Sequence, residues 1–300
     1  MTLHLPGLTP ATHTPFDSQG DVRLDVIDKQ AEFLTGKGIQ SVFVVGSTGE
    51  SHSLTMGERI SLAERWLQVT ARSSMQVVVH VGANCLKDAQ HLAQHAGENG
   101  AVAVAALAPS HFKSATIDEL VSWTASIAAQ CPETPFYFYD IPSLTGSSFS
   151  MVQYLEKATP LIPNLVGLKY TNSDLIGYQR VVQQYPQHDI LFGIDEYLLA
   201  ALSLGCQGAV GSTYNFAAPL YHKIIAAFQK GDMEVARKLQ YKSVQLVDLL
   251  CNCGGYMPAA KAVMEYLGIP VGAPRQPFPQ LSVENRRILL KKIEEFELRS

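Results

Sequence analysis

The sequence lacks the clustered positive charge that is typical of proteins that bind nucleic acids or anionic membranes. Only 17% of its 300 residues are charged, and 23 Lys and Arg against 27 Asp and Glu leave a formal net charge of −4. No basic tract or stripe occurs, so we expect neither nucleic acid nor a membrane as a partner. The apolar fraction of 47% is ample for a large core and is typical of a globular protein.

Signals for export, membrane crossing and metal binding are also missing. No segment approaches ~20 consecutive apolar residues, and the first residues do not join a basic region to a long apolar core. The five cysteines are odd in number, and Cys251-Asn252-Cys253 is too closely spaced for half of a zinc site. We therefore expect reduced thiols, no metal and a cytoplasmic location.

Eight short runs rich in apolar and β-branched residues recur along the chain, with helix-like segments between them. Several are continuous apolar runs instead of alternating ones, which is typical of parallel strands covered on both faces. The runs lie at residues 7–14, 41–45, 76–81, 102–107, 136–139, 165–170, 190–192 and 208–210.

Helix signals fill the gaps between these runs. Thr55, Thr116 and Ser150 are each followed three residues later by Glu or Gln, the capping-box pattern of a helix N-terminus. Eight alternating strand–helix units in residues 1–230 predict an α/β fold, a (β/α)8 TIM barrel, whose usual size is about 250 residues. We expect residues 231–300 to form a C-terminal helical extension, packed as part of one domain. A doubly wound sheet is the main alternative, but the even alternation favours a closed barrel.

The ends of the fifth and sixth runs carry the most informative residues. In a TIM barrel, polar side chains that follow the strands converge on one catalytic face. Lys169 lies at the end of the sixth run and Tyr139 at the end of the fifth. A lysine in this position either extends its amine to solvent or, when desolvated, acts as a nucleophile on a carbonyl. Lys169 and Tyr139 together suggest Schiff-base chemistry.

Polar residues after three other runs could hold the substrate. The turn Gly46-Ser47-Thr48-Gly49-Glu50 offers two hydroxyls and successive N–H groups, which suit a carboxylate, although an ordinary βα turn is the alternative. Asp195 and Glu196 follow the seventh run, and Ser212 follows the eighth. No histidine stands beside the two acids at ligand spacing, so hydrogen bonding to a polyol fits them better than a metal site.

Other residues near the strand ends have simpler expected roles. Phe136 and Phe138 are expected in the core, with Tyr137 facing the surrounding helices. His80 and His111 lie near predicted strand ends, where they are candidates to line the pocket.

Together these motifs resemble the N-acetylneuraminate lyase branch of the superfamily that also contains dihydrodipicolinate synthases. The resemblance covers the barrel and much of the extension, and residues 192–215 are most similar to animal forms. It is carried by Gly46-Ser47-Thr48-Gly49-Glu50, Tyr139-Asp140-Ile141-Pro142, Gly167-Leu168-Lys169, Gly193-Ile194-Asp195-Glu196 and Gly211-Ser212-Thr213-Tyr214-Asn215.

The resemblance implies a class I aldolase that reversibly splits N-acetylneuraminate into N-acetyl-D-mannosamine and pyruvate. Lys169 would form the Schiff base with the 2-keto group, and Tyr139 would transfer protons. Ser47 and Thr48 would hold the keto-acid carboxylate. The sugar chain would be contacted by Thr171, Gly193, Asp195, Glu196 and Ser212. Members of the family need no metal or organic cofactor and are commonly homotetramers.

The sequence departs from parts of this superfamily. Synthases usually carry an arginine soon after the Tyr-x-x-Pro motif, whereas residues 143–146 are Ser-Leu-Thr-Gly, which disfavours that activity. Many bacterial members place a tyrosine from the loop after the fourth strand in a neighbouring subunit's site. Here that loop reads Ser110-His111-Phe112, so any such contribution is altered or absent. Asp140 stands where many relatives have asparagine.

Two alternatives remain open at this stage. A pyruvate aldolase for another 2-keto sugar acid would keep Ser47, Thr48, Tyr139 and Lys169 and differ in the groups that bind the sugar chain. A keto-acid sensor would bind pyruvate without releasing an aldehyde.

Overall fold

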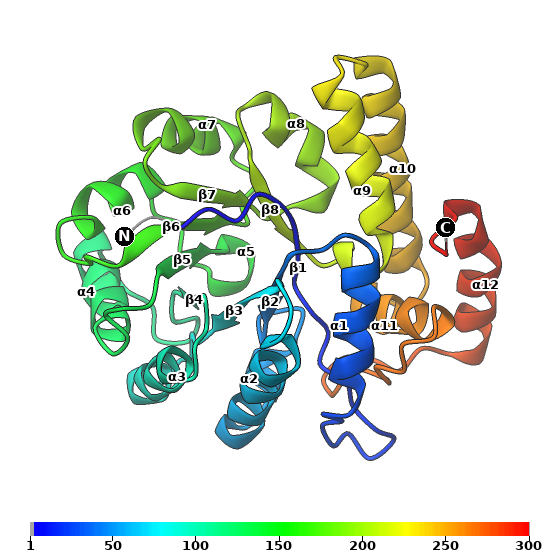
Figure 1. The fold of residues 1–300 in the computed structure, drawn as a ribbon, viewed down its shortest axis with the longest axis horizontal. Coiled ribbons are helices and arrows are strands. Elements are labelled where there is room, and N and C mark those ends of the chain that lie inside the picture. Colours follow the sequence, from blue (N-terminus) through cyan, green and yellow to red (C-terminus); the bar gives the residue numbers. More distant parts are fainter. Residues whose placement is uncertain (1–2, 300) are drawn as a thin grey trace.

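A computed structural model of the chain describes residues 3–299, in which eight parallel strands form a barrel surrounded by helices (Figure 1). Each of the eight predicted runs overlaps one strand, so the predicted TIM barrel is confirmed. The strands are β1 Gly7–Pro10, β2 Ser41–Val44, β3 Gln76–His80, β4 Ala103–Leu107, β5 Phe136–Asp140, β6 Leu165–Tyr170, β7 Asp189–Phe192 and β8 Gly208–Gly211. Their order is β1-β8-β7-β6-β5-β4-β3-β2, and a parallel bridge between Ala11 and Phe43 closes the ring.

Helices connect successive strands and cover the outside of the barrel. They are α1 Val26–Gly36, α2 Met56–Thr70, α3 Leu86–Glu98, α4 Ile117–Ala128, α5 Pro142–Thr145, α6 Met151–Ala158, α7 Leu175–Gln184, α8 Leu198–Ser203 and α9 Tyr214–Gln229. The predicted capping boxes at Thr55 and Thr116 are complete at the starts of α2 and α4. Ser150 accepts a hydrogen bond from the backbone N–H of Gln153 at the start of α6. These polar starts satisfy N–H groups that the first helical turn leaves without partners.

The C-terminal segment adds three further α-helices on one side of the barrel. These are α10 Met233–Asn252, α11 Tyr256–Tyr266 and α12 Val283–Ile293. In Figure 1, α10 runs beside α9, and α12 lies outermost. Every residue of α11 from Pro258 to Met264 is buried, so this helix is part of the core. Among residues 3–299, no helix has the length and apolar content needed to cross a membrane.

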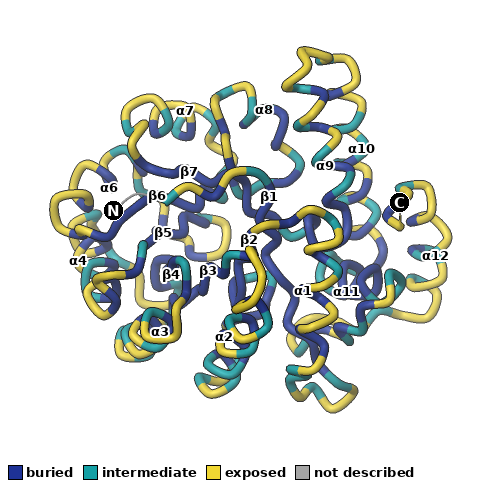
Figure 2. The backbone as a smooth tube through the Cα atoms, in the orientation of Figure 1, coloured by how far each residue is buried: buried dark blue, intermediate teal, exposed yellow. Residues whose placement is uncertain are grey.

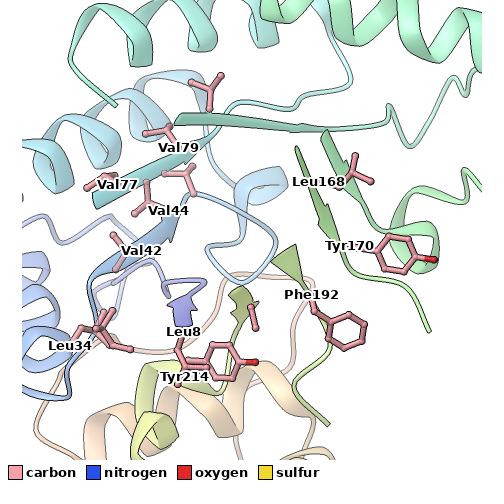
Figure 3. Packing of buried hydrophobic residues seen from close by; sticks show 14 of the residues in the cluster. Leu8, Leu34, Val42, Val44, Val77, Val79, Leu168, Tyr170, Phe192 and Tyr214 are labelled. Atoms are coloured by element: carbon pink, nitrogen blue, oxygen red, sulfur yellow. The ribbon is translucent and has the colours of Figure 1, made fainter. Parts of the chain in front are cut away.

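Side chains of each strand alternate between the barrel interior and the layer beneath the helices. Figure 3 shows part of this outer layer: Leu34 of α1 and Val42 lie on one side of the barrel, and Leu168 lies on the other side near Tyr170. Figure 2 shows the strands buried and the outward surfaces of the helices exposed. The alternation arises from the pleat of a strand, which turns successive side chains to opposite faces.

One predicted orientation is wrong. Phe136 and Phe138 belong to the outer core as expected, but Tyr137 belongs with Tyr139 to the apolar cluster inside the barrel. The Tyr137 hydroxyl donates to Asp189 Oδ2 over 2.7 Å instead of facing the helices. Because residues two apart on a strand share a face, a Tyr139 that points inward fixes Tyr137 inward as well.

Close contact between β6 and β7 sets the height of Lys169 in the barrel. Gly167 is paired with Asp189, and a Cβ at Gly167 would lie 1.9 Å from the Asp189 carbonyl oxygen. Only a glycine allows the two strands to approach this closely, and Lys169 follows two residues later on the same face.

We predict that Gly167→Ala destabilises the protein by about 3 kcal/mol or more, because backbone atoms cannot move aside as a flexible side chain can. Urea unfolding of the purified variant measures the loss. The matched control is Gly57→Ala in α2, where a new Cβ meets no atom within 4 Å and a gain of about 0.5 kcal/mol is expected. Equal unfolding midpoints for the two variants would contradict the prediction.

Candidate active site

A cavity of about 340 Å³ opens where the barrel strands end. It is lined by all nine residues that the sequence analysis proposes: Ser47, Thr48, Tyr139, Lys169, Thr171, Gly193, Asp195, Glu196 and Ser212. The residues come from the loops or ends of β2, β5, β6, β7 and β8, which closure of the barrel brings together.

Lys169 and Tyr139 are neighbours because β5 and β6 pair in one register. The two residues are Cα partners in the sheet, so their side chains project side by side into the barrel. Lys169 Nζ lies 3.8 Å from the centre of the Tyr139 ring and 4.1 Å from that of Phe43. Within residues 3–299 this buried amine forms no ion pair, so no carboxylate holds it away from a ligand.

The turn after β2 places the hydroxyls of Ser47 and Thr48 in the same cavity. Ser47 Oγ lies 3.3 Å from the Tyr139 hydroxyl. The turn is flanked by Val45 and Glu50, which adopt left-handed backbone conformations with φ of +57° and +56°. This conformation is rare for residues other than glycine and is unfavourable for a β-branched side chain, so neighbouring contacts must stabilise it. One such contact is the 2.6 Å hydrogen bond from Thr14 Oγ1 to the Gly49 carbonyl.

The opposite side of the cavity is polar and partly buried. Asp195 accepts hydrogen bonds from the backbone N–H and the hydroxyl of Thr213. Burial raises the pKa of Asp195 to about 6, although the bonds from Thr213 oppose this shift. Burial also raises the pKa of Glu196. Both acids present carboxyl oxygens to the cavity, where they can accept hydrogen bonds from hydroxyl groups of a ligand, and Thr213 holds Asp195 in place.

The C-terminal helices supply residues that the sequence analysis missed. Val247 and Cys251 of α10 and Tyr256 of α11 also line the cavity, and the Tyr256 hydroxyl lies 2.5 Å from Ser212 Oγ. No local pattern indicates this role, because it depends on how the extension folds back over the barrel. The only available signal was a general one, the aromatic residue between Gly255 and a helical pattern.

Neither histidine proposed for the pocket lines it. His80 is buried and packs edge-on against the Tyr139 ring at 5.8 Å between centroids, while its Nδ1 lies 3.0 Å from the Val45 carbonyl. His111 is exposed, and its backbone N–H donates to Asn84. Across residues 3–299, no group of three His, Cys, Asp or Glu side chains is arranged to hold a metal ion.

A second cavity, of about 1120 Å³, is larger but chemically less suited to catalysis. It lies between residues 16–23 and the segment around Arg275. The Arg275 guanidinium there already binds Glu58 and the carbonyls of Gly20 and Ser53. This arginine is thus already bound by groups of the fold, so volume alone does not identify the site.

Asp140, next to Tyr139, points away from the cavity into a buried environment. It accepts a 3.2 Å hydrogen bond from the Asn172 side chain. Burial raises the pKa of Asp140 to about 7, the bond from Asn172 opposes the shift, and Asp174 adds to it.

We predict that Asp140 makes the protein less stable as pH rises. Since the folded-state pKa lies above that of the unfolded chain, the folded protein retains a proton that the unfolded chain has lost. Between about pH 5 and pH 8 the wild type should lose roughly 2 kcal/mol of unfolding free energy relative to Asp140→Asn. Urea unfolding at both pH values tests this, with the exposed Asp118→Asn as control. Parallel pH profiles for wild type and Asp140→Asn would contradict it.

Comparison with known proteins connects this geometry to a family. The dihydrodipicolinate synthetase family model matches residues 4–296. N-acetylneuraminate lyase of Rattus norvegicus is 39% identical over 284 residues, which cover 93% of this chain and 89% of the rat protein. The solved structure of Proteus mirabilis N-acetylneuraminate lyase gives a TM-score of 0.95 at 35% identity, covering 99% of this chain and 100% of that chain.

A second solved structure agrees with the first. The sialic acid aldolase of Aliivibrio salmonicida also gives a TM-score of 0.95, at 36% identity, covering 99% of this chain and 98% of that one. The similarity spans the barrel strands, the loops that form the cavity and the C-terminal helices, and it confirms the resemblance found in the motifs. The chain belongs to the dihydrodipicolinate synthetase family.

Proposed function

We propose that this protein is a class I aldolase that reversibly cleaves N-acetylneuraminate into N-acetyl-D-mannosamine and pyruvate. The observation that carries the proposal is the buried amine of Lys169, 3.8 Å from the ring centre of Tyr139 in the cavity. The lyases of Rattus norvegicus and Proteus mirabilis, which align with nearly the whole chain, support the choice of substrate.

The proposed reaction begins with attack of Lys169 Nζ on C2 of the open-chain sugar acid. The carbonyl oxygen leaves as water, and a protonated iminium remains. The C4 hydroxyl then loses its proton, and the electron pair of the C3–C4 bond moves to C3 as that bond breaks. C4 becomes the aldehyde carbon of N-acetylmannosamine, and the iminium becomes an enamine. Protonation at C3 and hydrolysis release pyruvate and the free lysine, so no cofactor is needed.

Tyr139 is the proposed proton carrier, assisted by the substrate carboxylate. Its ring adjoins the Lys169 amine, and its hydroxyl lies 3.3 Å from Ser47 Oγ. A cationic iminium beside the phenol favours release of the phenol proton. Ser47 and Thr48 would bind the carboxylate through their hydroxyls and backbone N–H groups.

The remaining cavity residues are proposed to bind the sugar chain. Thr171 Oγ1 is buried and, among the described residues, has no hydrogen-bond partner, so it is available to a ligand. A Cβ at Gly193 would lie 2.0 Å from this oxygen, so glycine leaves the Thr171 hydroxyl its space. Asp195 and Glu196 would accept hydrogen bonds from sugar hydroxyls, with Ser212 beside them.

We also propose the arrangement of the whole protein from the same resemblance. Residues 1–230 and 231–300 are proposed to fold as one domain, and four copies to form a homotetramer in the cytoplasm. Phe112, on the loop after β4, is 85% exposed, and Leu144, in α5, is 61% exposed. Such apolar side chains favour contact with another subunit.

Product analysis with N-acetylneuraminate tests the function. We expect equimolar pyruvate and N-acetylmannosamine, and we expect borohydride with pyruvate to leave a reduced adduct on Lys169. Lys169→Ala should abolish both, whereas Lys113→Ala, which lies outside the cavity, should abolish neither. Pyruvate from other 2-keto sugar acids but not from N-acetylneuraminate would favour the other aldolase. Pyruvate binding without an aldehyde product from any acid would favour the sensor.

Tyr139→Phe should lower kcat by about 10²-fold or more, because it removes the proposed proton carrier and leaves the ring in place. Tyr137→Phe is the matched control, since it removes a hydroxyl from the same strand that bonds Asp189 and not the cavity. Steady-state kinetics with N-acetylneuraminate measure both. A kcat for Tyr139→Phe within a factor of about two of the control would exclude the proposed role.

A further inference from the structure

A fully buried ion pair joins the C-terminal extension to the turn after β2. Lys261 Nζ of α11 lies 2.9 Å from Glu50 Oε1, and both side chains are 0% exposed. Glu50 is the last residue of the Gly46-Ser47-Thr48-Gly49-Glu50 turn, so its side chain leaves the cavity while Ser47 and Thr48 line it. The pair therefore contacts the turn from behind.

Both carboxylate oxygens of Glu50 are bound by the extension. Glu50 Oε2 accepts a 2.8 Å hydrogen bond from the backbone N–H of Arg275. Lys261 also donates to the Ala273 carbonyl over 3.2 Å. The centre of the Phe16 ring lies 4.3 Å from Lys261 Nζ and 4.5 Å from Arg275 Cζ. The Glu50 side chain is thus held at two points in a closed environment.

A buried ion pair of this kind is poorly explained by stability alone. Removing two charges from water is costly, and apolar side chains of similar volume are often at least as stabilising. The pair does fix the orientation of the Glu50 carboxylate, because both of its oxygens are bound. The fixed orientation constrains Glu50, the residue to which the carboxylate belongs.

Glu50 carries an unfavourable backbone conformation that needs such a constraint. Its φ of +56° and the φ of +57° at Val45 lie at the two ends of the turn. Strained dihedrals persist only where surrounding contacts determine them. Backbone hydrogen bonds from Glu50 N to the Ser47 carbonyl and from Ser51 N to the Gly46 carbonyl close the turn, and the ion pair fixes its end.

We propose that Glu50, held by Lys261 and by the backbone N–H of Arg275, is a positioning residue that sets the strained turn so that Ser47 and Thr48 meet the substrate carboxylate. This inference rests on the proposed function, in which these two residues bind that carboxylate. The C-terminal extension thereby takes part in recognition of pyruvate without touching it. Lys169 and Tyr139 lie on β6 and β5, so loss of the ion pair should affect carboxylate binding before it affects the chemistry.

The test compares Glu50→Gln and Lys261→Met in the condensation direction. We expect the KM for pyruvate to rise about tenfold, while the KM for N-acetylmannosamine changes less than about twofold, because the turn contacts only the carboxylate end. Borohydride trapping of the amine gives a second readout that needs no turnover. Wild type should be trapped faster by pyruvate than by methyl pyruvate, and the variants should lose about tenfold of that preference.

Two further variants separate positioning from stability. Arg286→Gln breaks the ion pair with Glu265 that joins α12 to α11, and it should leave both readouts unchanged. The double variant Glu50→Gln/Lys261→Met leaves no buried charge unpaired, so it should regain the melting temperature lost in the single variants. The double variant should not regain the preference for pyruvate. Without the Lys261 ammonium, the side-chain amide introduced by Glu50→Gln is no longer held in one orientation.

The outcomes are distinct. A double variant that recovers the pyruvate preference together with its melting temperature would overturn the positioning role, as would folded single variants with an unchanged KM for pyruvate. Wild-type protein that is not trapped by pyruvate would overturn the proposed function, and this inference with it. Equal preference in wild type and variants, with trapping intact, would overturn this inference alone.

Discussion

The register between β5 and β6 is the constraint on which the cavity depends. Side chains alternate along a strand, so a slip of one residue would turn Lys169 toward the helices and Leu168 into the barrel. The pairing of Tyr139 with Lys169 places a phenol beside an amine. On its other side β6 is fixed at Gly167, where β6 and β7 approach too closely for any side chain. The chemistry of the site thus follows from backbone contacts deeper in the sheet.

Three of the buried carboxylates are bound by side chains of other elements, whereas the buried amine of Lys169 has no carboxylate partner among the described residues. Asp195 is bound by Thr213, Asp189 by Tyr137, and Glu50 by Lys261, each across two elements that are distant in sequence. A buried carboxylate is stabilised only when the folded chain places a hydrogen-bond donor or a cation beside it. Lys169 instead lies against the rings of Phe43 and Tyr139. A buried amine that contacts aromatic faces and a ligand cavity is suited to bonding with the ligand.

The residues whose positions follow from local pattern and from closure of the barrel can be predicted from the sequence. Continuous apolar runs gave the strands, and the residues just after them, including Lys169 and Asp195, lie together because parallel strands end at one face. The side of the strand on which Tyr137 lies was missed, although the inward placement of Tyr139 determines it. Tyr256 and Glu50's partner Lys261 could not be placed, because their contacts span the chain. The lone lysine within the apolar stretch Pro258–Met264 was nevertheless a sign that a buried partner existed.

The contact of Lys261 and Arg275 with Glu50 has a consequence for how this protein can be recombined. A TIM barrel with appended helices invites the exchange of those helices between relatives, as though they were a separate module. Here the exchange would cut through one buried cluster shared by the second βα loop, α11 and the segment after it. A chimaera therefore has to inherit Glu50, Lys261, Phe16 and the chain around Arg275 from one parent. The residues that must come from one parent therefore lie on both sides of the boundary between the barrel and the C-terminal helices.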